Sequence, residues 1–420
     1  MKREFQGTTL GAVAVASICL LGAMFAFGQT RGGAGQGQAA SRPGRGGQAA
    51  GAAAGRGAQA AGAPAQPAEK ELMAEEVYKN VQVLKGIPAN QFLATMGIMT
   101  SSLGVSCNTC HTSERDWQGY ADDAGNRDKD TSRKMIRMVN SINQANFGGR
   151  RLVTCYSCHR GSLSPKVIPS LAQVYDPNPS FDEPDNIGQS NPGATPPAQI
   201  LDKYIEAVGG AQRVAALNSF VAKGTFLGYP AQEGEERPVE IYVKGRQRTV
   251  VLEAADGDNV SVWDGEKGWV AEAGRPVPVV DLTGTFRDAA KVEADLSLPD
   301  QVKQALTNWR TGETVEIDGK DATLVFGTSP GRLPVKLYFD EQSGLLVRTV
   351  RFTDSPLGRS PYETDFSDYR DVNGVKMPFH MVISWLDGRS DITLTDVQTN
   401  VPVDASKFGK PAAPKVRTAR

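Results

Sequence analysis

Apolar side chains recur at helical spacing between residues 70 and 161. In a first predicted helix, four apolar residues are separated by four, four and three positions, so they share one face. These residues are Met73, Val77, Val81 and Leu84. Gly86 and Pro88 predict the end of this helix.

Two further helices are predicted in the same stretch. One follows Asn90, which we expect to be its N-cap, and ends at Gly104. The other runs from about residue 131 to residue 143. The apolar face of the former holds Phe92, Met96, Met99 and Leu103, and that of the latter holds Met135, Met138, Val139 and Ile142. The stretch is therefore predicted to be mostly helical.

After residue 199 the pattern changes from helical spacing to alternation. An amphipathic helix is predicted over residues 200–208, and after Leu217 short runs alternate apolar and polar positions, which is typical of strands with one buried face. Strands are predicted at residues 239–243, 249–252, 323–326, 335–339, 345–353 and 381–385, with turns at 264–265 and 371–374. We expect a multidomain α plus β fold, in which a small, mostly helical domain precedes an antiparallel β-rich domain.

Other segments lack the spacing of either element. Lys2 and Arg3 precede an apolar run from Leu10 to Phe27, which predicts an export signal or a membrane anchor. The predicted organisation is a signal peptide or membrane anchor at 1–28, a disordered Gly/Ala/Gln-rich linker at 29–69, the helical domain at 70–161, a Pro-rich linker at 162–198, the β-rich domain at 199–410 and a tail at 411–420.

Composition excludes one class of partner. The chain has 420 residues and a formal net charge of -1, so no basic field for nucleic acid is present. We expect no nucleic-acid partner.

The cysteines supply the chemistry. Residues 107–111 read Cys-Asn-Thr-Cys-His and residues 155–159 read Cys-Tyr-Ser-Cys-His, which is the haem c attachment signature. Two thiols on one turn bond to two edges of a porphyrin, and the adjacent imidazole then points at the iron. The chain has three histidines, and two of them directly follow these pairs. The predicted attachment residues are Cys107, Cys110, Cys155 and Cys158, and the predicted iron ligands are His111 and His159.

The cysteine pairs have two other interpretations, a zinc site and a pair of disulfides. Zinc ribbons also use spaced Cys-x-x-Cys pairs, but zinc does not require a histidine after each pair. Two disulfides, one within each pair, are the second alternative. We therefore predict two covalently bound haem c groups with iron.

Each iron needs a sixth ligand or keeps an open position. The remaining histidine, His380, lies far away in the strand-rich region, so methionine is the candidate. Met96 or Met99 is placed to serve the first haem, and Met135 or Met138 the second. The alternative is that these methionines fill the core. We also consider Trp117 and Tyr120 as walls of the first haem, with ordinary packing as the alternative.

Residues 76–161 resemble the cytochrome c subunit of photosynthetic reaction centres. The resemblance rests on Phe-Leu-Ala-Thr-Met at residues 92–96, Arg-Lys-Met-Ile-Arg-Met at 133–138, Ile-Asn at 142–143 and Val-Thr-Cys-Tyr-Ser-Cys-His-Arg-Gly at 153–161. It implies that Met96 and Met135 are the axial ligands. The family typically carries four haems in two pairs, whereas this chain has one pair, so it is similar to a two-haem, half-length form.

The β-rich region resembles periplasmic proteins of the outer-membrane lipoprotein carrier type. The resemblance rests on the helix-then-strand order and on the run Tyr-Arg-Asp-Val-Asn-Gly-Val-Lys-Met-Pro-Phe-His at residues 369–380. It implies a half-barrel-like domain whose concave side holds an acyl chain.

Together these features predict an exported, periplasmic or extracytoplasmic dihaem cytochrome that passes single electrons between redox protein partners, among them a membrane complex. We expect an electron carrier without catalytic residues rather than an enzyme. Two alternatives stay open: a peroxidase-like haem enzyme with one open iron, and a redox-sensing or lipid-binding module that works through the C-terminal domain.

Overall fold

The computed structural model describes residues 71–111, 120–121, 126–168, 191, 193–231, 234–255 and 257–417. The predicted leader (1–28), the predicted linker (29–69) and Trp117 lie outside these ranges, as do parts of the predicted second linker. Residues 68–420 form one compact unit. Within the described part of the chain, no helix is long and apolar enough to cross a bilayer.

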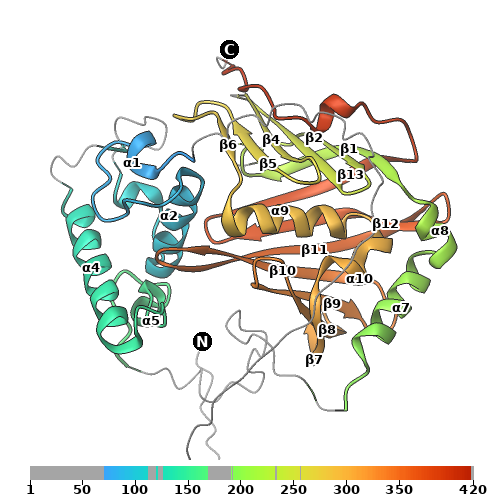
Figure 1. The fold of residues 1–420 in the computed structure, drawn as a ribbon, viewed down its shortest axis with the longest axis horizontal. Coiled ribbons are helices and arrows are strands. Elements are labelled where there is room, and N and C mark those ends of the chain that lie inside the picture. Colours follow the sequence, from blue (N-terminus) through green and yellow to red (C-terminus); the bar gives the residue numbers. More distant parts are fainter. Residues whose placement is uncertain are drawn as a thin grey trace, which may run out of the picture. The chain divides into compact units, whose positions relative to one another are not determined.

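The first part of this unit is helical (Figure 1). Its elements are α1 (Ala74–Val77), α2 (Ala89–Leu103), the short 3₁₀ turn η1 (Cys107–Thr109), α4 (Arg127–Phe147) and α5 (Cys155–His159). Helix α2 ends at Gly104, whose φ of 64° is left-handed, as the sequence predicts. Helix α4 is longer than expected because Asn126 caps it, accepting bonds from the amides of Asp128 and Lys129.

Two predictions about the first helices are wrong. The helix expected over residues 73–84 ends at Val77, because Tyr78 is extended and Asn80 takes a φ of 59°. The segment instead folds back, so that Leu84 and Ile87 are buried. Asn90 is not an N-cap, because α2 begins at Ala89 and its N-cap residue is Pro88.

A single antiparallel sheet follows, as predicted. Its 13 strands are ordered β6-β5-β4-β3-β2-β1-β13-β12-β11-β10-β9-β8-β7, and β6 and β7 form its two edges, so it is not closed. The strands are β1 (Ser219–Gly228), β2 (Arg237–Lys244), β3 (Gln247–Ala254), β4 (Gly257–Trp263), β5 (Gly268–Glu272), β6 (Val279–Asp281), β7 (Thr307–Ile317), β8 (Lys320–Thr328), β9 (Pro334–Asp340), β10 (Leu346–Ser355), β11 (Gly358–Val372), β12 (Val375–Trp385) and β13 (Gly388–Thr399).

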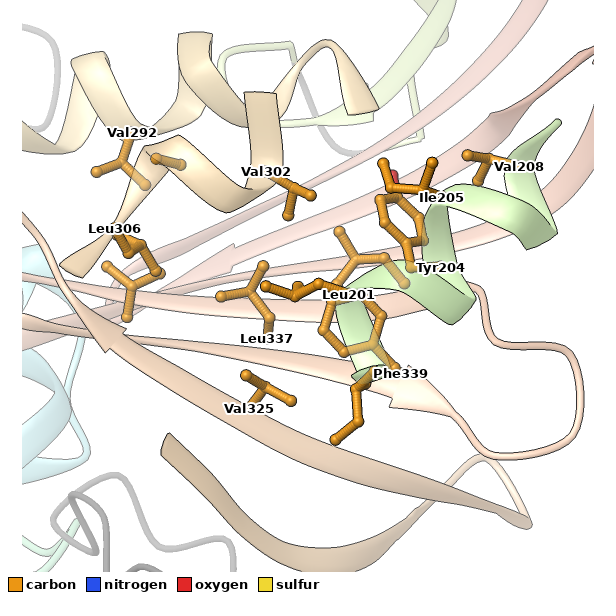
Figure 2. Close-up of a cluster of buried hydrophobic side chains, with 14 of the residues drawn as sticks. Leu201, Tyr204, Ile205, Val208, Val292, Val302, Leu306, Val325, Leu337 and Phe339 are labelled. Atoms are coloured by element: carbon orange, nitrogen blue, oxygen red, sulfur yellow. The ribbon is translucent and has the colours of Figure 1, made fainter. Parts of the chain in front are cut away.

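Helices cover one face of this sheet (Figure 1). They are α7 (Pro197–Val208), α8 (Ala211–Ala216), α9 (Gly284–Leu296) and α10 (Val302–Ala305), with the short turn η2 (Pro299–Gln301) before α10. The turn η3 (Ala405–Phe408), after the last strand, packs on the other face, where Phe408 contacts Tyr242. Figure 2 shows Leu201 and Tyr204 of α7 directed toward Leu337 and Phe339 of β9. Burial of these apolar side chains holds the helices against the sheet.

Candidate functional site

The first cysteine motif lies on one tight turn. The amide of Cys110 donates to the carbonyl of Cys107 at 3.1 Å, and the amide of His111 donates to the same oxygen at 3.0 Å. This turn therefore brings both thiols and the imidazole of the motif together, as haem attachment requires.

The His111 ring is oriented by a backbone carbonyl. Its Nδ1 lies 3.0 Å from the carbonyl oxygen of Tyr120, and the two rings are 4.5 Å apart. Because a carbonyl only accepts, Nδ1 carries the proton and Nε2 keeps its lone pair for a metal. The buried Lys129 ammonium donates to the same Tyr120 oxygen at 2.8 Å, which fixes the carbonyl in turn.

The start of α4 supports the first motif. The Asn126 side-chain amide donates to the carbonyl of Cys110 at 2.6 Å while its oxygen caps the helix. The Ser132 hydroxyl is hydrogen-bonded to the Cys110 thiol, whose pKa is raised mainly by burial.

An apolar cavity of about 1570 Å³ adjoins the first motif. Cys107, Cys110 and His111 line it, together with Met96 and Met99 of α2. Further apolar walls come from Val81, Leu84, Phe92, Leu103 and Val105. A porphyrin needs an apolar slot with a ligand on each side, and the donor set of this cavity fits that need. Both predicted alternatives for the axial methionine thus face the same cavity.

The second cysteine motif forms α5, which is held in the same manner. Thr154 is its N-cap residue, and the Ser157 hydroxyl accepts from the Thr154 amide at 3.0 Å. The Nδ1 of His159 lies 3.0 Å from the carbonyl oxygen of Ser162, so Nε2 is again left for a metal. Burial raises the pKa of the Cys155 thiol.

Asn143 ties the approach to the second motif to α4. Its side-chain oxygen accepts from the amides of Leu152 and Val153 at 3.1 and 3.0 Å, and its amide donates to the carbonyl of Val153 at 2.7 Å. Asn143 is only 4% exposed. The buried side chain therefore holds the segment that leads into Cys155 against α4 through these three hydrogen bonds.

Large apolar side chains near the second motif are exposed. On α4, Met135 and Met138 are 36% and 44% exposed, whereas Ile136 and Val139 are 3% and 8% exposed. Tyr156, within the motif, is 55% exposed. An exposed apolar surface beside a haem-attachment motif fits a flat apolar group that covers it. Neither methionine is singled out by burial.

The two motifs are joined through the end of α2. The amide of Gly161 donates to the carbonyl of Ser102 at 2.9 Å, and a β-carbon on Gly104 would lie 2.3 Å from the carbonyl oxygen of Gly161. Helix α2 thus borders the cavity at the first motif and contacts the chain just after the second.

The remaining histidine lies on the sheet. His380 Nδ1 is 2.7 Å from the hydroxyl of Ser367, and its Nε2 is 2.7 Å from a carboxylate oxygen of Asp391. The three residues belong to adjacent strands β11, β12 and β13, and none of them lines the cavity. We assign them a cross-strand structural role. Among the described residues, no three Cys, His, Asp or Glu side chains converge to hold a metal ion.

The sequence did not identify three positioning features: Asn126, Asn143 and the carbonyl of Tyr120. Asn143 belongs to the Ile-Asn pair of the resemblance, which was the only signal for it. Asn126 donates to a backbone carbonyl of the first motif, and the backbone carbonyl of Tyr120 accepts from the His111 ring. Backbone groups are common to all residues, so these partners leave no residue-type signature.

Comparison with known proteins agrees with the first predicted resemblance. Residues 35–216 match the family described as photosynthetic reaction centre cytochrome C subunit. The photosynthetic reaction center cytochrome c subunit of Thermochromatium tepidum is 38% identical over 116 residues, which are 26% of this chain and 26% of that protein. The subunit of Roseobacter denitrificans is 34% identical over 112 residues, 25% of this chain and 30% of that protein. The chain therefore spans under a third of the length of these relatives.

Other matches cover the strand-rich part. Residues 302–397 match a family of unknown function. A LolA superfamily protein from Nitrosomonas europaea is 14% identical, covering 52% of this chain and 99% of that chain with a TM-score of 0.35. A putative outer membrane lipoprotein-sorting protein domain from Vibrio parahaemolyticus is 10% identical, covering 50% of this chain and 97% of that chain with a TM-score of 0.34.

Proposed function

We propose that this chain, which resembles the reaction centre cytochrome c subunit over residues 35–216, is an exported dihaem c-type cytochrome that passes single electrons between redox partners. The observation that carries the proposal is the same at both motifs. Each motif histidine has its Nδ1 at 3.0 Å from a backbone carbonyl, which reserves Nε2 for iron.

In the proposed first site, Cys107 and Cys110 would attach the haem, and His111 and Met96 would hold its iron. The haem, when bound, supplies an iron that takes up and releases one electron. With His111 and Met96 both holding the iron, no position would be left for a substrate. A thioether and an imidazole ligand together would give a relatively high reduction potential, which suits delivery to an oxidising acceptor.

In the proposed second site, Cys155 and Cys158 would attach the haem, and His159 and Met135 would hold its iron. A haem placed over α4 would cover both exposed methionines, Met135 and Met138, and the choice of Met135 rests on the resemblance. Asn143 and the carbonyl of Ser162 hold the motif for that purpose. Two haems in one chain allow an electron to enter at one site and leave at the other.

For location and partners, the proposal is a periplasmic or extracytoplasmic protein that meets soluble redox proteins and a membrane-bound oxidising complex. The relatives are named as subunits of such a complex, the photosynthetic reaction centre. Reconstitution tests whether the partner complex is photosynthetic. Oxidation of the haems by isolated reaction centres after a light flash would support a photosynthetic partner. Oxidation in the dark by respiratory acceptors alone would support a respiratory partner instead.

The cavity favours a second role for the strand-rich region, which is binding of an apolar ligand. Its wall continues from the first motif over side chains of the sheet, including Ile241, Val250, Leu252 and Val260. A volume of about 1570 Å³ exceeds the 300–1,000 Å³ typical of small-molecule sites, so it has room beyond one haem. Extraction of the purified protein with organic solvent, followed by mass spectrometry, tests for copurifying lipid.

The primary test uses the full chain produced with a cytochrome c maturation system. We expect the intact mass to show two covalent haems and the reduced-minus-oxidised spectrum to show two low-spin irons that do not bind carbon monoxide. One iron that binds carbon monoxide would favour a peroxidase-like haem enzyme. A chain without haem would refute the proposal.

A further inference from the structure

Helix α2 presents different faces to the cavity and to the sheet. Met96 and Met99 line the cavity, whereas Gly97 and Ser101, four residues apart, do not line it and contact the turn between β12 and β13. The helix is about 22 Å long at 1.5 Å per residue. Because it is one rigid element, any contact that rotates or shifts its sheet side also moves Met96.

The turn between β12 and β13 lies directly on α2. A β-carbon placed on Gly97 would lie 2.9 Å from the carboxyl carbon of Asp387 and 3.0 Å from both of its oxygens. One turn further along, the Ser101 hydroxyl donates to the carbonyl of Leu386. The Asp387 carboxylate is itself held by a hydrogen bond from the side chain of Trp385. Glycine at position 97 is thus needed for this close approach.

The turn between β10 and β11 packs beside it. Leu357 is 3% exposed and belongs to one apolar cluster with Ile98, against which Met96, Met99 and Leu386 also pack. The same hairpin reaches the second motif, because Arg151 pairs with Asp354 at 2.7 Å. Leu357 and Leu386, one from each turn, therefore share a core with the methionine side chains.

We infer that these two hairpin turns form a clamp on α2 that sets the position of the Met96 thioether, with Asp387 as a positioning residue. This inference rests on the proposed function. It adds that contacts from the sheet help to position Met96, the proposed ligand of the first haem. The clamp contacts the helix that carries Met96, whereas it reaches the second motif only through the Arg151–Asp354 pair and the end of α2, and that motif is also held by Asn143 and the carbonyl of Ser162.

A volume exchange across the contact tests the clamp. Gly97→Val adds three heavy atoms where Asp387 lies, and Asp387→Ala removes three. We expect Gly97→Val to increase carbon monoxide binding at the first iron at least tenfold, to weaken the thioether-to-iron charge-transfer band and to lower the potential of the first haem. Each tenfold change in the relative stability of the two oxidation states corresponds to about 59 mV. The second haem is the internal comparison and should change less than the first, because Asn143 and the carbonyl of Ser162 also hold its motif.

The double variant Gly97→Val/Asp387→Ala should return the first haem toward wild type, because the added and removed volumes offset each other. Asp387→Ala alone leaves the Ser101 bond and the Leu357 packing, so we expect a smaller shift, with faster amide hydrogen exchange in α2. Asp371→Ala is the matched control, since this carboxylate accepts from Gly374 in the turn between β11 and β12, and it should leave both haems unchanged.

The outcomes separate the two levels of inference. If the wild-type first iron already binds carbon monoxide, the proposed ligand set fails, whatever the variants do. If the wild type is six-coordinate but Gly97→Val equals it, or Asp387→Ala gives no rescue, the clamp is refuted and the electron carrier stands. Should Gly97→Val attach no haem, Ser101→Ala and Leu357→Ala replace it, and the absence of any first-haem shift in both refutes the clamp.

Discussion

Met96 and Met99 lie on the same face of α2 and line the same cavity, so geometry alone leaves both within the candidate site. We expect Met96→Ala to open the first haem to carbon monoxide and to lower its potential by on the order of 100 mV, a fraction of the roughly 0.8 V range that axial ligands set. Met99→Ala is the matched control and should keep the low-spin spectrum. A redox titration with and without carbon monoxide measures both effects. If the spectra of the two variants are exchanged, Met99 is the ligand.

Asn143 is the most heavily bonded polar side chain at the second motif. Asn143→Ala removes three hydrogen bonds at a residue that is 4% exposed, so we expect the free energy of unfolding to fall by about 2–3 kcal/mol. Asn146→Ala is the control on the same helix, because that exposed side chain makes one bond to the carbonyl of Ile142 and should change stability by less than about 0.5 kcal/mol. Urea unfolding measures the free energy of unfolding of both variants. Equal decreases would show that the hydrogen bonds of Asn143 do not stabilise the protein more than the bond of Asn146.

At the scale of elements, two helix ends offer a matched comparison. Gly104 ends α2 with a φ of 64°, and Gly148 ends α4 with a φ of 61°. Alanine costs about 1–2 kcal/mol in this left-handed region at either position. Only at Gly104 does the β-carbon meet backbone, at 2.3 Å from the Gly161 oxygen, whereas Gly148 has nothing within 4 Å. We expect Gly104→Ala to destabilise the protein by clearly more than Gly148→Ala and to reduce haem attachment at Cys155 and Cys158. Thermal unfolding and intact mass measure this, and equal effects would refute the contact.

Elements with strong periodicity were predictable from the sequence, and those set by distant contacts were not. The apolar face of α2, its end at Gly104 and the antiparallel strands follow from local spacing and turn residues. The helix expected from Met73 to Leu84 failed because its apolar residues serve a folded-back segment instead, in which Leu84 joins a cluster with Leu357. Asn90 looks like a cap, yet its side chain donates to the carbonyl of Asp281, 191 positions away. No local pattern carries that partner.

The candidate site divides in the same way. Cys107, Cys110, His111 and their counterparts at residues 155–159 were identified from spacing, and whether they bind haem stays a prediction. The spacing of residues did not predict the contact between Gly97 and Asp387. A glycine inside a helix indicates only a weak helix propensity and says nothing about its partner. Its significance appears once the turn after β12 is placed on α2.

At the scale of the whole molecule, the cavity joins the first motif to the sheet. Met96 and His111 lie on its wall together with Ile241 and Val260, so an apolar ligand over the sheet would also displace water near the first haem. A lower local dielectric disfavours the more highly charged oxidised form, and the reduction potential of the first haem should therefore rise. The second haem, whose motif residues do not line the cavity, should keep its potential. A neutral long-chain alcohol is the suitable probe because it adds no charge.

Potentiometric titration with and without the saturating alcohol measures both potentials in one sample. Val250 lies on the same face of the sheet as Ile241 and lines the cavity. Val250→Trp therefore narrows the sheet side of the cavity without changing either cysteine motif, so in this variant the alcohol should bind more weakly and the shift should shrink. Equal shifts at both haems would indicate a general solvent effect. A shift that persists in Val250→Trp would place the alcohol elsewhere. If the shift is confined to the first haem and is lost in the variant, binding of an apolar ligand in the cavity over the sheet changes the reduction potential of the first haem.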